Sequence, residues 1–336
     1  MADSRLYLSA YGPPALERLA RLVAEAKRAD VLAPVTVVVP TQYAGLSLRR
    51  DLASGQGLVN VRFMVPARLA EFLGSPTLAE RGKRPLSPLA EREAIRALAG
   101  RLAGDGPLGP VAQHPSLHSS LLSTFRDLDR LSNDELSSLE GMDPLRSQMV
   151  HWYRAVRERL GGYYGVEELA WAAAAAVRDG KAASALRDLG LVIFHLARAP
   201  SPGEAGLVNA LGEIGQCAMI LGLTGDVEPD AVAKDVAARF QLVLGAAQLA
   251  GPAPGSFDAH HLVSASDVRE EVRRAVRYIA GRAEGGLPFH RMAVLYRQSG
   301  PYASLVPSQL RLAGIPVAGP DPAPLRDTPA GKLLLS

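Results

Sequence analysis

The chain has 336 residues, of which 48% are hydrophobic and 21% charged, with 37 Lys and Arg against 34 Asp and Glu. This length predicts two or three domains. The single cysteine, Cys217, excludes an internal disulfide framework and a cysteine-based zinc site. The longest apolar runs, such as Ala170–Val177 and Leu189–Leu196, are far shorter than the roughly 20 residues that cross a bilayer. We therefore expect a cytoplasmic protein without a membrane partner.

The first 75 residues alternate between the patterns of a strand and a helix. Val35–Val39 is a short β-branched run that ends at Pro40, which is typical of a buried strand. The order of these short units predicts a parallel, doubly wound sheet. The predicted strands are Arg5–Tyr11, Val35–Val39 and Val59–Met64, and the predicted helices are Ala15–Ala29, Ala44–Leu52 and Pro66–Leu73.

From about Leu78 to Leu186 no segment has a convincing strand pattern, and helical patterns follow one another. Breaks rich in glycine and proline, such as Gly104–Pro110, separate some of them. We predict an all-helical insertion whose helices are Pro88–Leu102, Leu117–Leu131, Pro144–Leu160 and Val166–Arg178.

The sheet pattern then resumes in two continuous apolar runs, Leu189–Phe194 and Cys217–Leu223, with a predicted helix at Gly203–Leu211 between them. Gly251–Gly255 has the composition of a linker. A second α/β unit is predicted after it, with strands near His261–Ser264, Met292–Tyr296 and Ile315–Val317 and helices at Ser266–Gly281 and Tyr302–Ala313. The last residues, Gly331–Ser336, have the pattern of a helix that is beginning, so we expect a longer parent protein.

A strand, a glycine turn and a helix at the N-terminus are the usual setting of a phosphate-binding loop. Such a loop needs free backbone N–H groups, a lysine, and a Ser or Thr for magnesium. Here Gly12 is followed by Pro13 and Pro14, which remove two N–H donors, and no Lys-Ser/Thr pair follows. Glu17 adds negative charge near the helix start. The sequence therefore predicts a degenerate phosphate loop and no bound nucleotide cofactor.

The strand at Leu189–Phe194 is the expected position of an acidic pair that holds magnesium and polarises water. The residues after it are His195-Leu196-Ala197-Arg198, without a carboxylate. These two absences together predict that the chain carries no catalytic residue for ATP hydrolysis and no metal site.

In this order of elements, the chain resembles the N-terminal, helicase-like part of the AddB-type family, the nuclease subunits of ATP-dependent helicase–deoxyribonucleases related to superfamily 1 helicases. Each motif is degenerate, and their combined order carries the resemblance. The matching segments are Val37–Leu52, Val61–Leu73, Ile220–Asp226, Glu270–Ile279, Met292–Arg297 and Gly314–Val317.

The resemblance implies a RecA-like, P-loop NTPase-type parallel sheet in two parts, residues 1–77 and 187–250. Residues 78–186 are then the helical insertion, and residues 251–336 begin a second RecA-like domain. Related subunits that lack the lysine and the acidic pair, such as the exonuclease V gamma chain, serve as DNA scaffolds. We therefore expect an ATPase-inactive, DNA-binding scaffold that acts on DNA ends in double-strand break repair and recombination, beside an AddA-like motor subunit.

The resemblance also suggests which residues contact DNA and which match a nucleotide contact. Arg297 matches the arginine that reaches the γ-phosphate in active helicases; pairing with a carboxylate or with DNA remains open. Tyr43 and Phe63 are candidates for stacking on bases, with core packing the alternative for Phe63. The candidate DNA contacts are Thr41, Gln42, Arg49, Arg50, Arg68 and Thr224.

Several of these residues also fit ordinary structural roles. Thr41 and Gln42 follow a parallel strand, where α/β sheets bind ligands, but capping of the next helix accounts for them equally well. Arg49, Arg50 and Arg68 form either a basic strip for a DNA backbone or a solvated helix face.

Two alternative functions stay open. The family's nuclease uses Pro-Asp followed by (Asp/Glu)-x-Lys around a metal. Pro229-Asp230 has no such tripeptide after it, and Asp179-Gly180-Lys181 is an isolated match, so a nuclease is expected only beyond Ser336. The other alternative is a protein–protein interaction module that supports a partner motor through the helical insertion, without direct DNA contact.

Overall fold

The structure is a computed structural model, and it describes all residues except 1–4, 55–56, 103–105, 255–260, 298–299 and 320–336. The chain divides into two compact units, Met1–Ser256 and Phe257–Ser336, which are described separately. The predicted helix start at Gly331–Ser336 lies outside the described residues.

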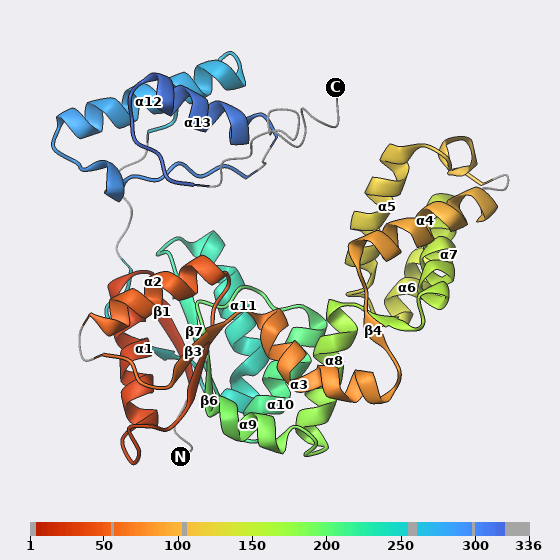
Figure 1. The fold of residues 1–336 in the computed structure, drawn as a ribbon, viewed down its shortest axis with the longest axis horizontal. Coiled ribbons are helices and arrows are strands. Elements are labelled where there is room, and N and C mark those ends of the chain that lie inside the picture. The colour runs from red at the N-terminus through yellow and green to blue at the C-terminus, as the bar shows by residue number, and fades with distance from the viewer. Residues whose placement is uncertain (1–4, 55–56, 103–105, 255–260, 298–299, 320–336) are drawn as a thin grey trace, which may run out of the picture. The chain divides into compact units, whose positions relative to one another are not determined.

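The first unit is built on a six-stranded sheet in which every pair of neighbouring strands is parallel (Figure 1). The prediction of a parallel α/β sheet is thereby confirmed. The order across the sheet is β3-β2-β6-β7-β1-β8. The strands are β1 (Leu6–Ala10), β2 (Val35–Val38), β3 (Val61–Met64), β6 (Leu191–His195), β7 (Cys217–Leu223) and β8 (Gln248–Leu249).

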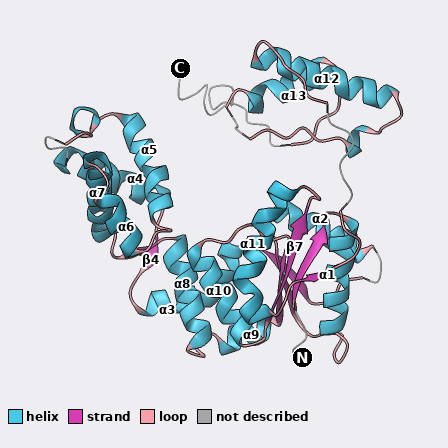
Figure 2. Cartoon of the chain, turned by 180° about the vertical axis from the view of Figure 1, so that it is seen from behind, coloured by secondary structure: helices cyan, strands magenta, loops and turns pink. Residues whose placement is uncertain are grey.

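Helices cover both faces of this sheet, which explains why β2 and β7 are buried at every position (Figure 2). Apolar side chains of α1 (Pro13–Ala26) and α2 (Gln42–Ala53) pack on one face. The helices that pack on the other face are α3 (Pro66–Glu80), α8 (Val166–Arg178), α9 (Ala183–Leu189), α10 (Pro202–Glu213) and α11 (Val227–Leu244).

The elements around strands β6 and β7 differ from the prediction. Leu189 ends α9 rather than starting a strand, because Gly190 adopts a φ of 63° and terminates that helix; β6 begins at Leu191. Helix α11 was not predicted from the sequence pattern. Its apolar residues Val236, Ala237, Phe240 and Leu244 are buried against the sheet.

Four helices of the insertion pack around a core of their own, which includes Phe125 and Trp152. They are α4 (Pro88–Leu102), α5 (Pro115–Leu128), α6 (Asn133–Glu140) and α7 (Pro144–Arg159). A short parallel pair, β4 (Arg84–Pro85) and β5 (Tyr163–Tyr164), joins this cluster to the rest of the unit. The expectation of no strand between Leu78 and Leu186 is therefore wrong at these two places.

Helix α8 packs with α3 and α10 beside the sheet, although its sequence looks like a continuation of the insertion. Gly74 of α3 allows this contact, since a Cβ there would lie 2.7 Å from the backbone nitrogen of Ala173. The alanines of α8 thus serve close helix packing.

The second unit contains α12 (Val268–Glu284) and α13 (Tyr302–Leu312), which pack through Val272, Val306, Leu310 and Ile315. The three strands predicted there, near His261–Ser264, Met292–Tyr296 and Ile315–Val317, are wrong: these segments pair with no described segment. Short apolar runs fit a strand or a packing loop equally well, and here Val294 and Ile315 cover the two helices instead. In the described part of the whole chain, no helix is long and apolar enough to cross a membrane.

Candidate functional site

The carboxyl ends of the central strands form the first candidate site. Strands β1 and β2 lead into α1 and α2 on one face, whereas β6 and β7 lead into α10 and α11 on the other. Neighbouring strands whose connections leave in opposite directions open a crevice, and α/β proteins bind ligands in such crevices. Here the direction reverses between β1 and β7 and again between β2 and β6.

The turn after β1 is very short. Only Tyr11 and Gly12 separate β1 from α1, and Pro13 occupies the first position of the helix. Gly12 has a φ of 85°, a conformation that favours glycine, and no side chain caps the helix. Two residues followed by two prolines leave too few backbone N–H groups to surround a phosphate.

A cavity of about 650 Å³ lies in this crevice and extends between α2 and α11. Tyr11 forms part of its wall, and the ring lies so close to β7 that a Cβ on Gly222 would overlap it. Arg198, which is exposed, also lines the cavity. Most of the other lining residues are apolar.

His195, the last residue of β6, lines the same cavity and is only 2% exposed. Its Nδ1 atom is buried and has no hydrogen-bond partner among the described residues. Burial lowers the pKa of His195 to about 4, so the imidazole is neutral at pH 7. Leu196, the next residue, has a φ of 50°, in the left-handed region that non-glycine residues rarely adopt. In the sequence, His195 stands out only because it occupies a position where a carboxylate was expected.

A second candidate site is a groove of about 950 Å³ along β3, the edge strand of the sheet. It brings together three of the predicted DNA contacts, Gln42 and Arg49 from α2 and Arg68 from α3. Arg62 of β3 joins them; it was not predicted, because only the structure shows that β3 is the exposed edge strand of the sheet. Arg68 pairs with Glu71 at 2.6 Å.

Two other predicted contacts, Thr41 and Thr224, form local hydrogen bonds instead. The Thr41 hydroxyl accepts a hydrogen bond from the Ala44 backbone nitrogen at 3.2 Å and so caps α2. The Thr224 backbone nitrogen and hydroxyl donate to the Asp230 carboxylate at 2.7 and 2.9 Å. These hydrogen bonds lower the pKa of Asp230.

Of the remaining candidates, only Phe63 lines the β3 groove among the described residues. Arg50 is exposed in the last turn of α2 and does not line the β3 groove. Tyr43 is 82% exposed, whereas Phe63 is half-buried and packs against Gly45. Arg297 is an exposed residue of the second unit.

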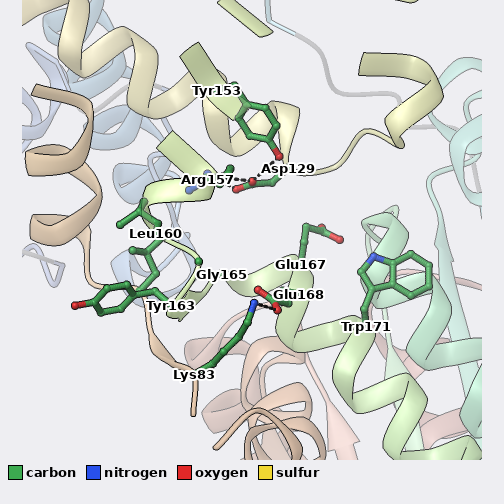
Figure 3. A pocket seen from close by; sticks show the side chains of 12 residues that line it. Lys83, Asp129, Tyr153, Arg157, Leu160, Tyr163, Gly165, Glu167, Glu168 and Trp171 are labelled. Carbon is green, nitrogen blue, oxygen red and sulfur yellow. Dashed lines mark hydrogen bonds and ion pairs between the residues drawn. The ribbon is translucent and has the colours of Figure 1, made fainter. Parts of the chain in front are cut away.

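A third cavity, of about 420 Å³, lies where the helical cluster meets α8 (Figure 3). Arg157 of α7 contacts Asp129 at 2.6 Å and the buried Glu91 of α4 at 3.1 Å, and the Tyr153 hydroxyl donates to Asp129 at 3.0 Å. On the other side of the cavity, Lys83 pairs with Glu168.

Burial and ion pairing act in opposite directions on the pKa values of this charged network. Burial raises the pKa of Asp129, which Arg157 opposes, and together with Asp129 it raises the pKa of Tyr153 to about 12. Burial alone lowers the pKa of Arg157, but the charges of Asp129 and Glu91 outweigh it and raise that pKa. Because each charge has a partner, we interpret the network as a structural link between α4, α5 and α7. Within the described part of the chain, no group of three or more His, Cys, Asp and Glu residues is placed to hold a metal ion.

Comparison with known proteins adds no family to this description. No protein-family model matches the sequence, and no curated protein matches it. The parallel sheet and the geometry of its cavities are therefore the basis for a functional proposal.

Proposed function

We propose that this chain is an ATPase-inactive, helicase-like scaffold that binds DNA through the arginine-lined groove along β3. The six-stranded parallel sheet with a helical insertion is consistent with a RecA-like topology, which supports the proposal. The resemblance to AddB-type subunits suggests the setting: DNA ends in double-strand break repair and recombination, with an AddA-like motor as partner.

The charge of the groove supports the proposal, because its arginines outnumber its single carboxylate, Glu71. Glu71 neutralises Arg68, whereas Arg49 and Arg62 form no ion pair with a described residue. Guanidinium groups bind phosphates through two parallel hydrogen bonds, and each phosphate contact releases condensed counterions. Two unpaired guanidinium groups beside Gln42 therefore suit a phosphate backbone.

The turn between β1 and α1 supports the absence of ATPase activity. It holds only Tyr11 and Gly12 before two prolines, so it lacks the loop that binds a triphosphate. His195 at the end of β6 and Arg198 after it occupy positions where a motor needs carboxylates. On this proposal the sheet positions nucleic acid and a separate subunit supplies the work of ATP hydrolysis.

The double variant Arg49→Ala, Arg62→Ala tests the groove. Wild-type protein is expected to bind a single-stranded oligonucleotide with an affinity that falls steeply as salt rises. The variant is expected to bind more weakly and to lose roughly 1 to 2 from the slope of log K against log[salt], because each lost phosphate contact removes about 0.7. Fluorescence anisotropy of a labelled oligonucleotide at several salt concentrations measures both quantities.

A matched control keeps the change in net charge but moves it away from the groove. Arg92→Ala with Arg101→Ala removes two exposed arginines from α4 and is expected to keep the wild-type slope. Equal losses in both double variants indicate a general charge effect and contradict the groove assignment. Absence of DNA binding by the wild type favours the alternative, a protein–protein interaction module built on the α4–α7 cluster, and DNA binding that neither double variant changes contradicts the groove assignment.

Nucleotide binding is the second test. We expect no heat of binding and no thermal stabilisation with magnesium-ATP at concentrations on the order of 1 mM, because the turn at Gly12 lacks a phosphate site. The assay is sensitive enough, since a ligand present at its dissociation constant already stabilises a protein measurably. Isothermal titration calorimetry and a thermal-shift assay check this result. A saturable calorimetric signal in the millimolar range contradicts the proposal that the turn at Gly12 has lost its phosphate site.

A further inference from the structure

Three independent features coincide where β6 ends. The buried Nδ1 of His195 has no hydrogen-bond partner among the described residues. Leu196 holds a strained φ of 50°. Both residues line the 650 Å³ cavity at the carboxyl edge of the sheet. Buried polar atoms are usually satisfied, and backbone strain gathers at binding sites, so this combination indicates a ligand site.

The chemistry of the cavity wall narrows the class of ligand. The wall is mostly apolar, and the ring of Tyr11 forms a flat part of it, as is common in pockets for small molecules. Arg198 is the one charged side chain among the described lining residues, which include no carboxylate. The apolar lining includes Leu48, Leu196, Leu221, Val232 and Val236.

We propose that this cavity binds a small organic monoanion with a flat, apolar body, an aryl carboxylic acid being the simplest member of the class. The carboxylate pairs with Arg198, the ring packs against Tyr11, and the body of the ligand lies beside the His195 imidazole. A single guanidinium group matches a single negative charge. A triphosphate would bring several charges to a site whose neighbouring turn has too few N–H donors.

This inference does not depend on the proposed DNA function. It uses the crevice between β1, β7, β6 and β2, whereas the proposed DNA contacts line the groove along β3. The two sites share no lining residue. Either site can therefore fail its test without affecting the other.

Titration with phenylacetate, followed by protein and ligand NMR, tests the proposal. We expect saturable binding with a dissociation constant on the order of 1 mM, as suits a ligand of this size, and a shift of the His195 ring resonances. Phenylacetamide has the same shape without the charge and is expected to bind at least about 10-fold more weakly. Arg198→Gln is expected to weaken phenylacetate binding by a similar factor.

Two further variants control for folding and for location. Arg187→Gln changes an exposed arginine of α9 outside the cavity and is expected to leave the affinity unchanged. Val232→Trp fills the cavity from a half-exposed position on α11 and is expected to abolish binding while the protein stays folded. The proposal is overturned by absence of binding at 20-fold the expected constant, roughly 20 mM. It is equally overturned if Arg198→Gln or Val232→Trp binds like the wild type.

Discussion

Replacing Arg157 by methionine is expected to lower the free energy of unfolding of the α4–α7 cluster by about 3 to 5 kcal/mol. Methionine keeps much of the apolar contact of the Arg157 side chain but cannot pair with a carboxylate. Asp129 then has no cationic partner, and Glu91 keeps only its ion pair with Arg126, at 3.2 Å. Glu91 is 4% exposed, so water cannot solvate its charge. Hydrogen exchange of the amides in these helices, with urea unfolding, measures the loss.

Arg154→Gln is the matched control on the same helix. Arg154 also pairs with a carboxylate, Glu140, but both side chains are half-exposed, and such pairs contribute no more than about 1 kcal/mol. A second variant that adds Glu91→Gln to Arg157→Met removes one of the stranded charges and is expected to recover part of the loss. If Arg157→Met costs no more than Arg154→Gln, the network does not stabilise the cluster.

His195 is expected to make the first unit less stable as the pH falls from about 6.5 to about 4. An unfolded chain protonates this histidine near its ordinary pKa of 6.5, whereas burial lowers the pKa in the folded protein to about 4. Between these values the unfolded state binds more protons, so the free energy of unfolding rises with pH. The difference between the two pKa values corresponds to about 3 kcal/mol.

The difference between wild type and His195→Gln isolates this contribution from that of the carboxylates. Urea unfolding followed from pH 4 to pH 7 is expected to show a shallower pH dependence in the variant, whatever its stability at pH 7. His151→Gln, at an exposed position of α7, is expected to retain the wild-type slope. Parallel curves for wild type and His195→Gln would show that the imidazole protonates equally in both states.

Much of the architecture follows from local patterns that the sequence contains by itself. The apolar run Cys217–Leu223 is β7 at the same residues, and α4 and α8 have the bounds that helical periodicity and their flanking residues predict. The prolines after Gly12 likewise determine that α1 starts without a phosphate loop, because proline lacks an N–H group in any fold.

Other features depend on contacts between distant segments. Residues 292–296 have a strand-like pattern, but a strand forms only when another segment pairs with it, and none does among the described residues. Helix α8 reads as part of the insertion, yet Gly74 and the alanines of α8 place it beside the sheet.

The candidate sites show the same division. The sequence named Gln42, Arg49 and Arg68, but only the position of β3 at the sheet edge adds Arg62 to them. His195 is a candidate because it is buried at the end of β6, and no local sequence pattern predicts that burial. Periodicity records which side of an element is apolar, while the packing of distant segments decides what that side meets and which polar atoms lose contact with water.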